Sequence, residues 1–149
     1  MKKPNATLAS YMNYVSEEGL NLDRFVEHGA RMLGSAEAAN LKEGLAELHA
    51  KISTVRGELP RLALQLEFLV GYFESSPWSP GDKVRNETIF ALHYAAKDMD
   101  LMPDDMPEVG YLDDAAVVES VLSRHGDAFE QFCAAKGIDW TAVKPEPAE

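Results

Sequence analysis

One cysteine in 149 residues excludes an internal disulfide, and basic side chains are also scarce, with 14 lysines and arginines against 25 aspartates and glutamates. The formal net charge of −11 repels phosphate backbones and anionic lipids, so we expect no nucleic-acid partner. No apolar run reaches the ~20 residues of a bilayer span, which argues against membrane insertion. The first residues lack the apolar run of a secretory signal, and together with the lone cysteine this predicts a cytoplasmic protein.

Apolar residues make up 46% of the chain and recur at helical spacing, whereas no long stretch alternates apolar and polar residues as a strand does. The pattern predicts an all-α, single-domain bundle of about six to seven helices over residues 1–143. Asn21 and Asp82 are expected to cap helices at their N-termini. Residues 144–149, with two prolines and two glutamates, are expected to form a disordered tail.

A heptad of apolar residues continues in one phase from Ala38 to Phe73. One interpretation is a coiled-coil seam for dimerisation, and the other is a pair of antiparallel helices separated near Gly57 and Pro60. A continuous helix over this run would be about 54 Å long. A domain of this size is only about 40 Å across, which favours the break. If the seam binds a partner, its contact residues would include Leu41, Leu45 and Leu48.

Two neighbouring segments complete the prediction for the middle of the chain. Residues 59–73 are apolar almost all round, which predicts the buried central helix of the bundle. Residues 75–81 contain two prolines and a glycine and are expected to form a loop. Within this loop, Trp78 either packs over the end of the bundle or stands exposed as an anchor for a partner.

The acidic charge is concentrated between residues 98 and 123, which contain eight carboxylates and no lysine or arginine. Carboxylates this close together repel each other unless backbone amides cap them, solvent separates them, or a cation joins them. The eight residues are Asp98, Asp100, Asp104, Asp105, Glu108, Asp113, Asp114 and Glu119.

Residues 100–114 read Asp-Leu-Met-Pro-Asp-Asp-Met-Pro-Glu-Val-Gly-Tyr-Leu-Asp-Asp. This run resembles the signature Asp-Leu-Ile-Pro-Asp-x-Ile-Pro-x-x-Gly-x-x-Asp-Asp of the YkvA-like domain of unknown function, which is found in many bacterial proteins. The resemblance covers about residues 89–121 and implies two apolar helices that meet at the motif. Because the family has no established activity, it implies no reaction. The matching residues are Asp100, Pro103, Asp104, Pro107, Gly110, Asp113 and Asp114.

Two interpretations of this motif remain open. In the first, the prolines and the glycine fix a corner between two helices, and the carboxylates accept backbone amides or favour the start of the second helix. In the second, the corner holds Mg²⁺ or Ca²⁺, because hard cations prefer oxygen ligands. The ligands would be Asp100, Asp104, Asp113 and Asp114, which His93 and His125 flank.

The sequence contains no glycine-rich phosphate-binding loop and no nucleophile elbow. Cys133 lies beside Phe129 and Phe132 and is interpreted as a buried core thiol. We therefore expect a non-catalytic interaction or scaffold module without a cofactor, whose partner is a second copy or another protein. One alternative is a divalent-metal-dependent hydrolase that uses the aspartates of residues 100–114. Another, motivated by the net charge alone, is an acidic inhibitor or immunity-type protein that binds a basic target.

Overall fold

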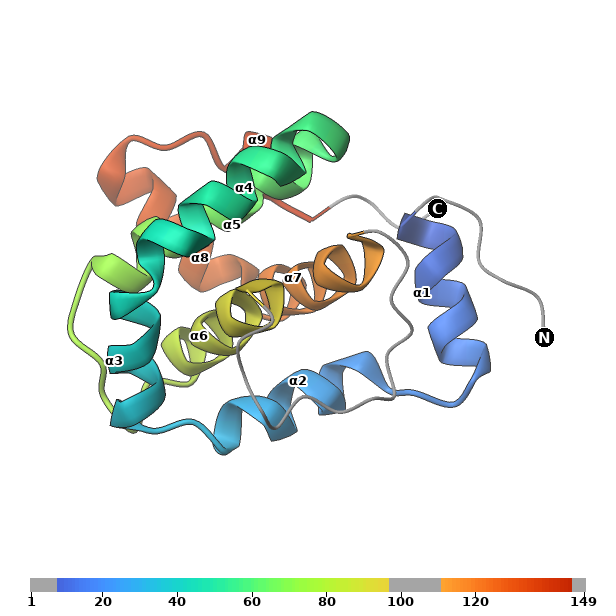
Figure 1. The fold of residues 1–149 in the computed structure, drawn as a ribbon, viewed down its shortest axis with the longest axis horizontal. Helices are drawn as coiled ribbons and strands as arrows, with labels where there is room; N and C mark the ends of the chain where they lie inside the picture. The colour runs from blue at the N-terminus through green and yellow to red at the C-terminus, as the bar shows by residue number, and fades with distance from the viewer. Residues whose placement is uncertain (1–7, 97–110, 146–149) are drawn as a thin grey trace.

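The computed structural model describes residues 8–96 and 111–145, and these residues form nine α-helices and no strand (Figure 1). The all-α prediction is confirmed, with more helices than the expected six to seven. The helices are α1 (Leu8–Glu17), α2 (Leu22–Arg31), α3 (Ser35–Glu43), α4 (Leu45–Glu58), α5 (Pro60–Glu74), α6 (Lys83–Ala96), α7 (Leu112–Arg124), α8 (Gly126–Lys136) and α9 (Trp140–Val143).

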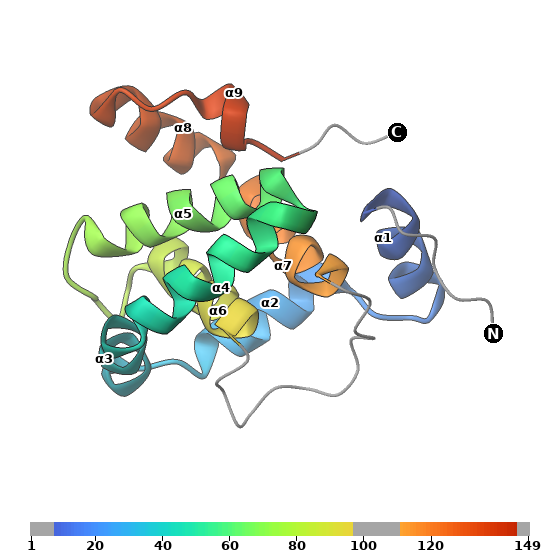
Figure 2. The same ribbon diagram turned by 45° about the horizontal axis from the view of Figure 1, so that its top comes forward.

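The antiparallel helices α6 and α7 occupy the centre of the fold (Figures 1 and 2). Between them they pack against helices α1 to α5 and α8. Helix α2 lies along one side of this hairpin and the α4–α5 pair along another, while α8 and α9 cover the outer side of α5 (Figure 2). Almost every residue of α6 and α7 is therefore buried, including several charged ones.

Helix boundaries follow local signals in the sequence. The Asn21 side chain accepts the backbone N–H of Arg24 at 3.1 Å, and the Asp82 side chain accepts that of Arg85 at 2.9 Å. Both residues thus serve as the predicted N-terminal caps. At the other end of a helix, Gly137 ends α8 with φ of 71°, a conformation that glycine adopts without a steric penalty.

The heptad run is divided among three helices instead of forming one long helix. The predicted break at Pro60 is confirmed, because this residue begins α5, where its missing N–H costs no helical hydrogen bond. A second break, which we did not predict, falls at Gly44 between α3 and α4. Helices α4 and α5 then run antiparallel, and Arg56 and Glu67 form an ion pair across them.

One expectation about the core needs correction. Helix α5 is not the central helix, because α6 and α7 are buried more completely and Leu64 of α5 remains 43% exposed. Of the tail expected to be disordered, residues 146–149 lie outside the described residues, and the Lys144 carbonyl oxygen accepts hydrogen bonds from Arg61 and Gln65. Cys133 is buried in the core as predicted. Among the described helices, none combines the length and the apolar character that crossing a bilayer requires.

Candidate functional site

Carboxylates are buried at three places in the described part of the central hairpin, and the first is the end of α6 nearest to its N-terminus. The Glu87 side chain is only 1% exposed and binds the Arg124 guanidinium, with one contact at 3.3 Å from Nη1 to Oε2. The Nε2 atom of His125 lies 3.0 Å from Glu87 Oε1. Arg124 also reaches Asp23 and Glu27 of α2, both at 3.4 Å. This cluster joins α2, α6 and the α7–α8 junction.

The electrostatics of this cluster favour the ionised carboxylate. Burial alone would raise the pKa of Glu87, but the hydrogen bond and charge of His125, together with the Arg124 guanidinium, outweigh burial. The pKa of Glu87 is therefore held below its ordinary value. Glu87 is thus an anion whose ion pair with Arg124 links α6 to α7, and it is poorly suited to donate a proton near neutral pH.

The second place is the start of α7, where Asp113 and Asp114 are 0% and 2% exposed. The Tyr94 hydroxyl donates to Asp113 Oδ2 at 3.1 Å, and Lys51 Nζ lies 3.7 Å from Asp114 Oδ2. Burial, and then the charge of Asp113, raise the pKa of Tyr94, which keeps the phenol protonated as the donor. Lys51 also donates to the carbonyl of Ala95 near the end of α6. The Lys51 ammonium, which α4 carries, thereby contacts both α6 and α7.

The third place lies along the middle of α7. Gln65 of α5 is buried and donates from Nε2 to Glu119 Oε2 at 3.3 Å and to the Val143 carbonyl at 3.1 Å. This amide therefore holds α5, α7 and the end of α9 together. Each buried carboxylate of α6 and α7 thus contacts a donor or cation of the same chain.

The predicted metal ligands are only partly within the described residues. Asp100 and Asp104 lie outside them, as do Pro103, Pro107 and Gly110 of the same motif. Asp113 and Asp114 are described, and their side chains go to different partners, a tyrosine and a lysine. The described part of the chain contains no group of three or more acidic, histidine or cysteine side chains placed to hold a metal ion. His93 and His125, the flanking histidines, bind the Glu37 carbonyl and Glu87 respectively.

The predicted interaction residues occupy different environments. Leu41 and Leu48 are 2% and 1% exposed, because their side chains pack into the core of the same chain. Leu45 is partly buried against that core. Trp78 is half-buried, packs against the core and donates from Nε1 to Asn86 Oδ1 at 2.6 Å. Of these candidates, Trp78 is the one that lines a groove.

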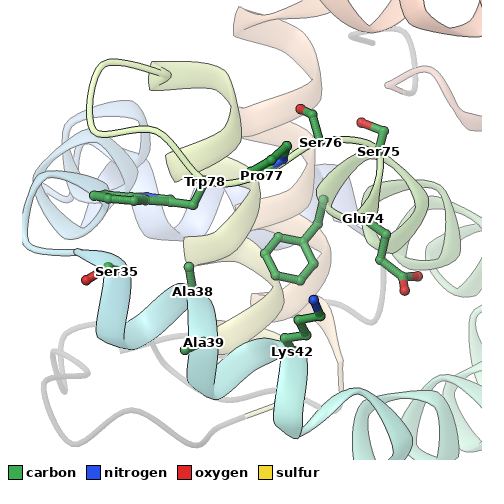
Figure 3. A pocket seen from close by; sticks show the side chains of 10 residues that line it. Ser35, Ala38, Ala39, Lys42, Glu74, Ser75, Ser76, Pro77 and Trp78 are labelled. Carbon is green, nitrogen blue, oxygen red and sulfur yellow. The ribbon is translucent and has the colours of Figure 1, made fainter.

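This groove, which we call the α3 groove, has a volume of about 640 Å³ and lies between α3 and the end of α5 with the loop that follows it (Figure 3). One wall is a face of α3 with small side chains, and the other is the loop that carries Trp78. Its volume falls within the ~300–1,000 Å³ range of ligand pockets. The lining residues are Ser35, Ala38, Ala39, Lys42, Phe73, Glu74, Ser75, Ser76, Pro77 and Trp78.

A buried arginine fixes the loop wall of the α3 groove. Arg85 is 4% exposed and donates to the carbonyl oxygens of Tyr72 and Phe73 at 2.5 and 3.0 Å. It also donates to the Ser76 hydroxyl at 2.5 Å, and its guanidinium lies over the Tyr72 ring at 4.7 Å. These carbonyls belong to the last turn of α5, where helical hydrogen bonds run out, and the Tyr72 carbonyl also accepts the N–H and the hydroxyl of Ser75. The loop is therefore held against the helices on both sides.

The acidic motif of residues 100–114 gave no indication of the buried ion pairs or of the α3 groove. A lysine, an arginine or a glutamate inside a helical pattern normally predicts a solvated face, and each partner of Glu87 and Asp114 is distant in the sequence. The α3 groove has one signal in the sequence, because Ser35, Ala38, Ala39 and Lys42 fall at positions i, i+3, i+4 and i+7 of one helix face.

Comparison with known proteins gives one family match. A model of the family described as "Protein of unknown function (DUF1232)" matches residues 87–119, which begin in α6 and end in α7. No curated protein and no solved structure matches the chain. The protein therefore contains an uncharacterised domain of unknown function, whose matched residues lie in the central hairpin and the segment that connects its helices.

Proposed function

We propose that this protein is a non-catalytic interaction module that binds another protein through the α3 groove. The observation that carries the proposal is the groove itself, an open concavity of about 640 Å³ with Trp78 and Phe73 among its lining residues. Aromatic side chains in preformed concave sites are typical anchors of protein interfaces. The small side chains of Ala38 and Ala39 leave room for a side chain of the partner.

The buried polar groups of the hairpin support a structural role for α6 and α7 in this proposal. Glu87 faces Arg124, and Asp114 faces Lys51, so these carboxylates already have cationic partners inside the chain. Charges paired in this way link distant helices and leave the carboxylates little freedom to act on a substrate. The hairpin would thus be the frame that holds α3 and the loop of Trp78 in place.

The groove lies outside the family match. Its lining runs from Ser35 to Lys42 and from Phe73 to Trp78, whereas the family model matches residues 87–119. Under this proposal, the family segment supplies the central frame and the preceding helices supply the binding surface. The choice of partner would then be a property of this chain and not of the domain of unknown function as such.

The proposal is tested by a photo-crosslinker at position 39 of the full chain, followed by purification of the captured protein and calorimetry with the two purified proteins. The wild type should bind, and Ala39→Leu should weaken binding at least about tenfold, because the larger side chain fills the groove. Ala46→Leu makes the same change at an exposed position of α4 outside the groove and should bind as the wild type does. Equal binding by Ala39→Leu and Ala46→Leu would refute the proposal.

A further inference from the structure

The α3 groove has an aromatic end and a charged end (Figure 3). Trp78 and Ser35 lie at one end, Lys42 and Glu74 lie toward the other, and the small side chain of Ala38 lies between them. The hydrogen bond from Trp78 Nε1 to Asn86 fixes the indole ring, so the aromatic end is formed before anything binds. An occupant therefore needs a large apolar group and a charged group at separate positions.

The charged end contains one cation and one anion. Lys42 and Glu74 are both exposed, and neither makes an ion pair with another residue of the described chain. Their opposite charges largely cancel at a distance, so the sign of the charge that the groove attracts depends on the rest of the molecule. That remainder is strongly acidic, because the whole chain carries a net charge of −11. Its field attracts cationic partners and repels anionic ones.

We infer that the occupant of the α3 groove is a basic segment of a partner protein that carries a large apolar side chain and a lysine or arginine. The apolar side chain lies over Ala38 and Ala39 against Trp78, and the basic side chain pairs with Glu74. Lys42 repels that basic group and so directs it to the Glu74 wall. This inference rests on the proposed function and adds the chemistry of the partner to it.

The probes are three capped helical peptides with leucine and phenylalanine at the same positions. The remaining positions are all lysine in the first peptide, all serine in the second and all glutamate in the third. Binding to the full-length protein is measured by calorimetry at low and at physiological salt, with amide chemical shifts to locate the site. At low salt, the lysine peptide should bind at least about tenfold more tightly than the glutamate peptide, and added salt should reduce this difference in affinity. The shifted amides should be those of α3 and residues 73–78.

Matched variants separate the local charge from the total charge. Glu74→Gln should weaken binding of the lysine peptide about two- to fivefold, as expected for an exposed ion pair. Glu58→Gln removes the same charge from an exposed position of α4 that does not line the groove, and it should leave the affinity unchanged. Ala39→Leu should weaken binding of the lysine peptide by about tenfold or more, whereas Ala46→Leu should not.

Each outcome has a distinct meaning. If none of the three peptides binds, the proposed function itself is refuted. If the serine or glutamate peptide binds as tightly as the lysine peptide and Ala39→Leu still blocks it, the groove binds proteins but the inferred basic partner is wrong. Equal effects of Glu74→Gln and Glu58→Gln would also overturn the inference. A dimer that forms without peptide and dissociates in Ala39→Leu would make a second copy the occupant, which likewise overturns it.

Discussion

Replacing Gly29 of α2 with alanine should destabilise the protein, although the same change usually stabilises a helix. A Cβ atom at Gly29 would lie 2.2 Å from Phe90 Cε1, which is far inside van der Waals contact. The Phe90 ring cannot easily move away, because it is 1% exposed and packs edge-on against Phe25, with the two ring centroids 5.7 Å apart. The Tyr94 ring also packs near Phe90, with the two ring centroids 6.3 Å apart.

The magnitude follows from two opposing terms. Alanine gains up to about 1 kcal/mol over glycine in a helix interior. Overpacking a well-filled core costs about 1–3 kcal/mol. The net change for Gly29→Ala is then a loss of roughly 0–2 kcal/mol. Gly71 of α5 is the matched control, because a Cβ there meets nothing within 4 Å and Gly71→Ala should keep the full helical gain.

Urea unfolding followed by far-ultraviolet circular dichroism measures both variants. The free energies of unfolding of Gly29→Ala and Gly71→Ala should differ by about 1–3 kcal/mol. Gly29→Ala should be the less stable variant, because only its new methyl group overpacks the core. For a protein of this size, each kcal/mol corresponds to about 2–4 °C in melting temperature. A Gly29→Ala protein as stable as Gly71→Ala would refute the close packing of α2 on α6.

Three further predictions concern Glu87 and the aspartates of the acidic motif. Glu87→Gln should lower the free energy of unfolding at neutral pH by roughly 3 kcal/mol, because Arg124 stays partly buried without its main partner, as urea unfolding would show. Because folding lowers the pKa of Glu87, its stabilisation is present above the unfolded value of about 4.5 and is lost as the pH falls through the lower folded pKa. The stability difference between wild type and Glu87→Gln should therefore shrink below about pH 4.5, and a constant difference from pH 7 to 3 would contradict this account. Melting curves in Mg²⁺, Ca²⁺ and EDTA should superimpose if the aspartates of residues 100–114 are structural, whereas a cation at 100 times its dissociation constant would add about 2.7 kcal/mol.

The sequence predicted those features of the fold that depend on a few neighbouring residues. Asn21 and Asp82 cap their helices, and Pro60 begins one, because each effect involves the residue and the first turn of the helix beside it. The break at Gly44 was missed because the apolar heptad continues through it in the same phase. Helix α9 was also missed, since four residues show no periodicity.

The central position of α6 could not be predicted from its own residues. With Arg85, Glu87 and His93, the helix looks like a surface element, yet each of these side chains is buried against partners from other helices or loops. The partners of Glu87 and His93 are distant in the sequence, so no local pattern indicates that these side chains are buried. For the candidate site, the sequence pointed to Trp78, but the groove depends on the packing of α3 opposite its loop. The acidic motif was located by its pattern, and its described part, Asp113 and Asp114, is held by Tyr94 and Lys51.

The packing of α1 on α7 has a consequence for synthesis on the ribosome. Helix α1 packs mainly on α7, and Ser120 of α7 donates to Asp23 of α2 at 2.7 Å across 97 positions of sequence. While the nascent chain is still short of residue 112, the apolar face of α1 lacks the surface that will bury it, whereas α2 can already pack against α6. Contacts of such long sequence separation form late. Helix α1 must therefore remain exposed to chaperones and proteases until α7 emerges.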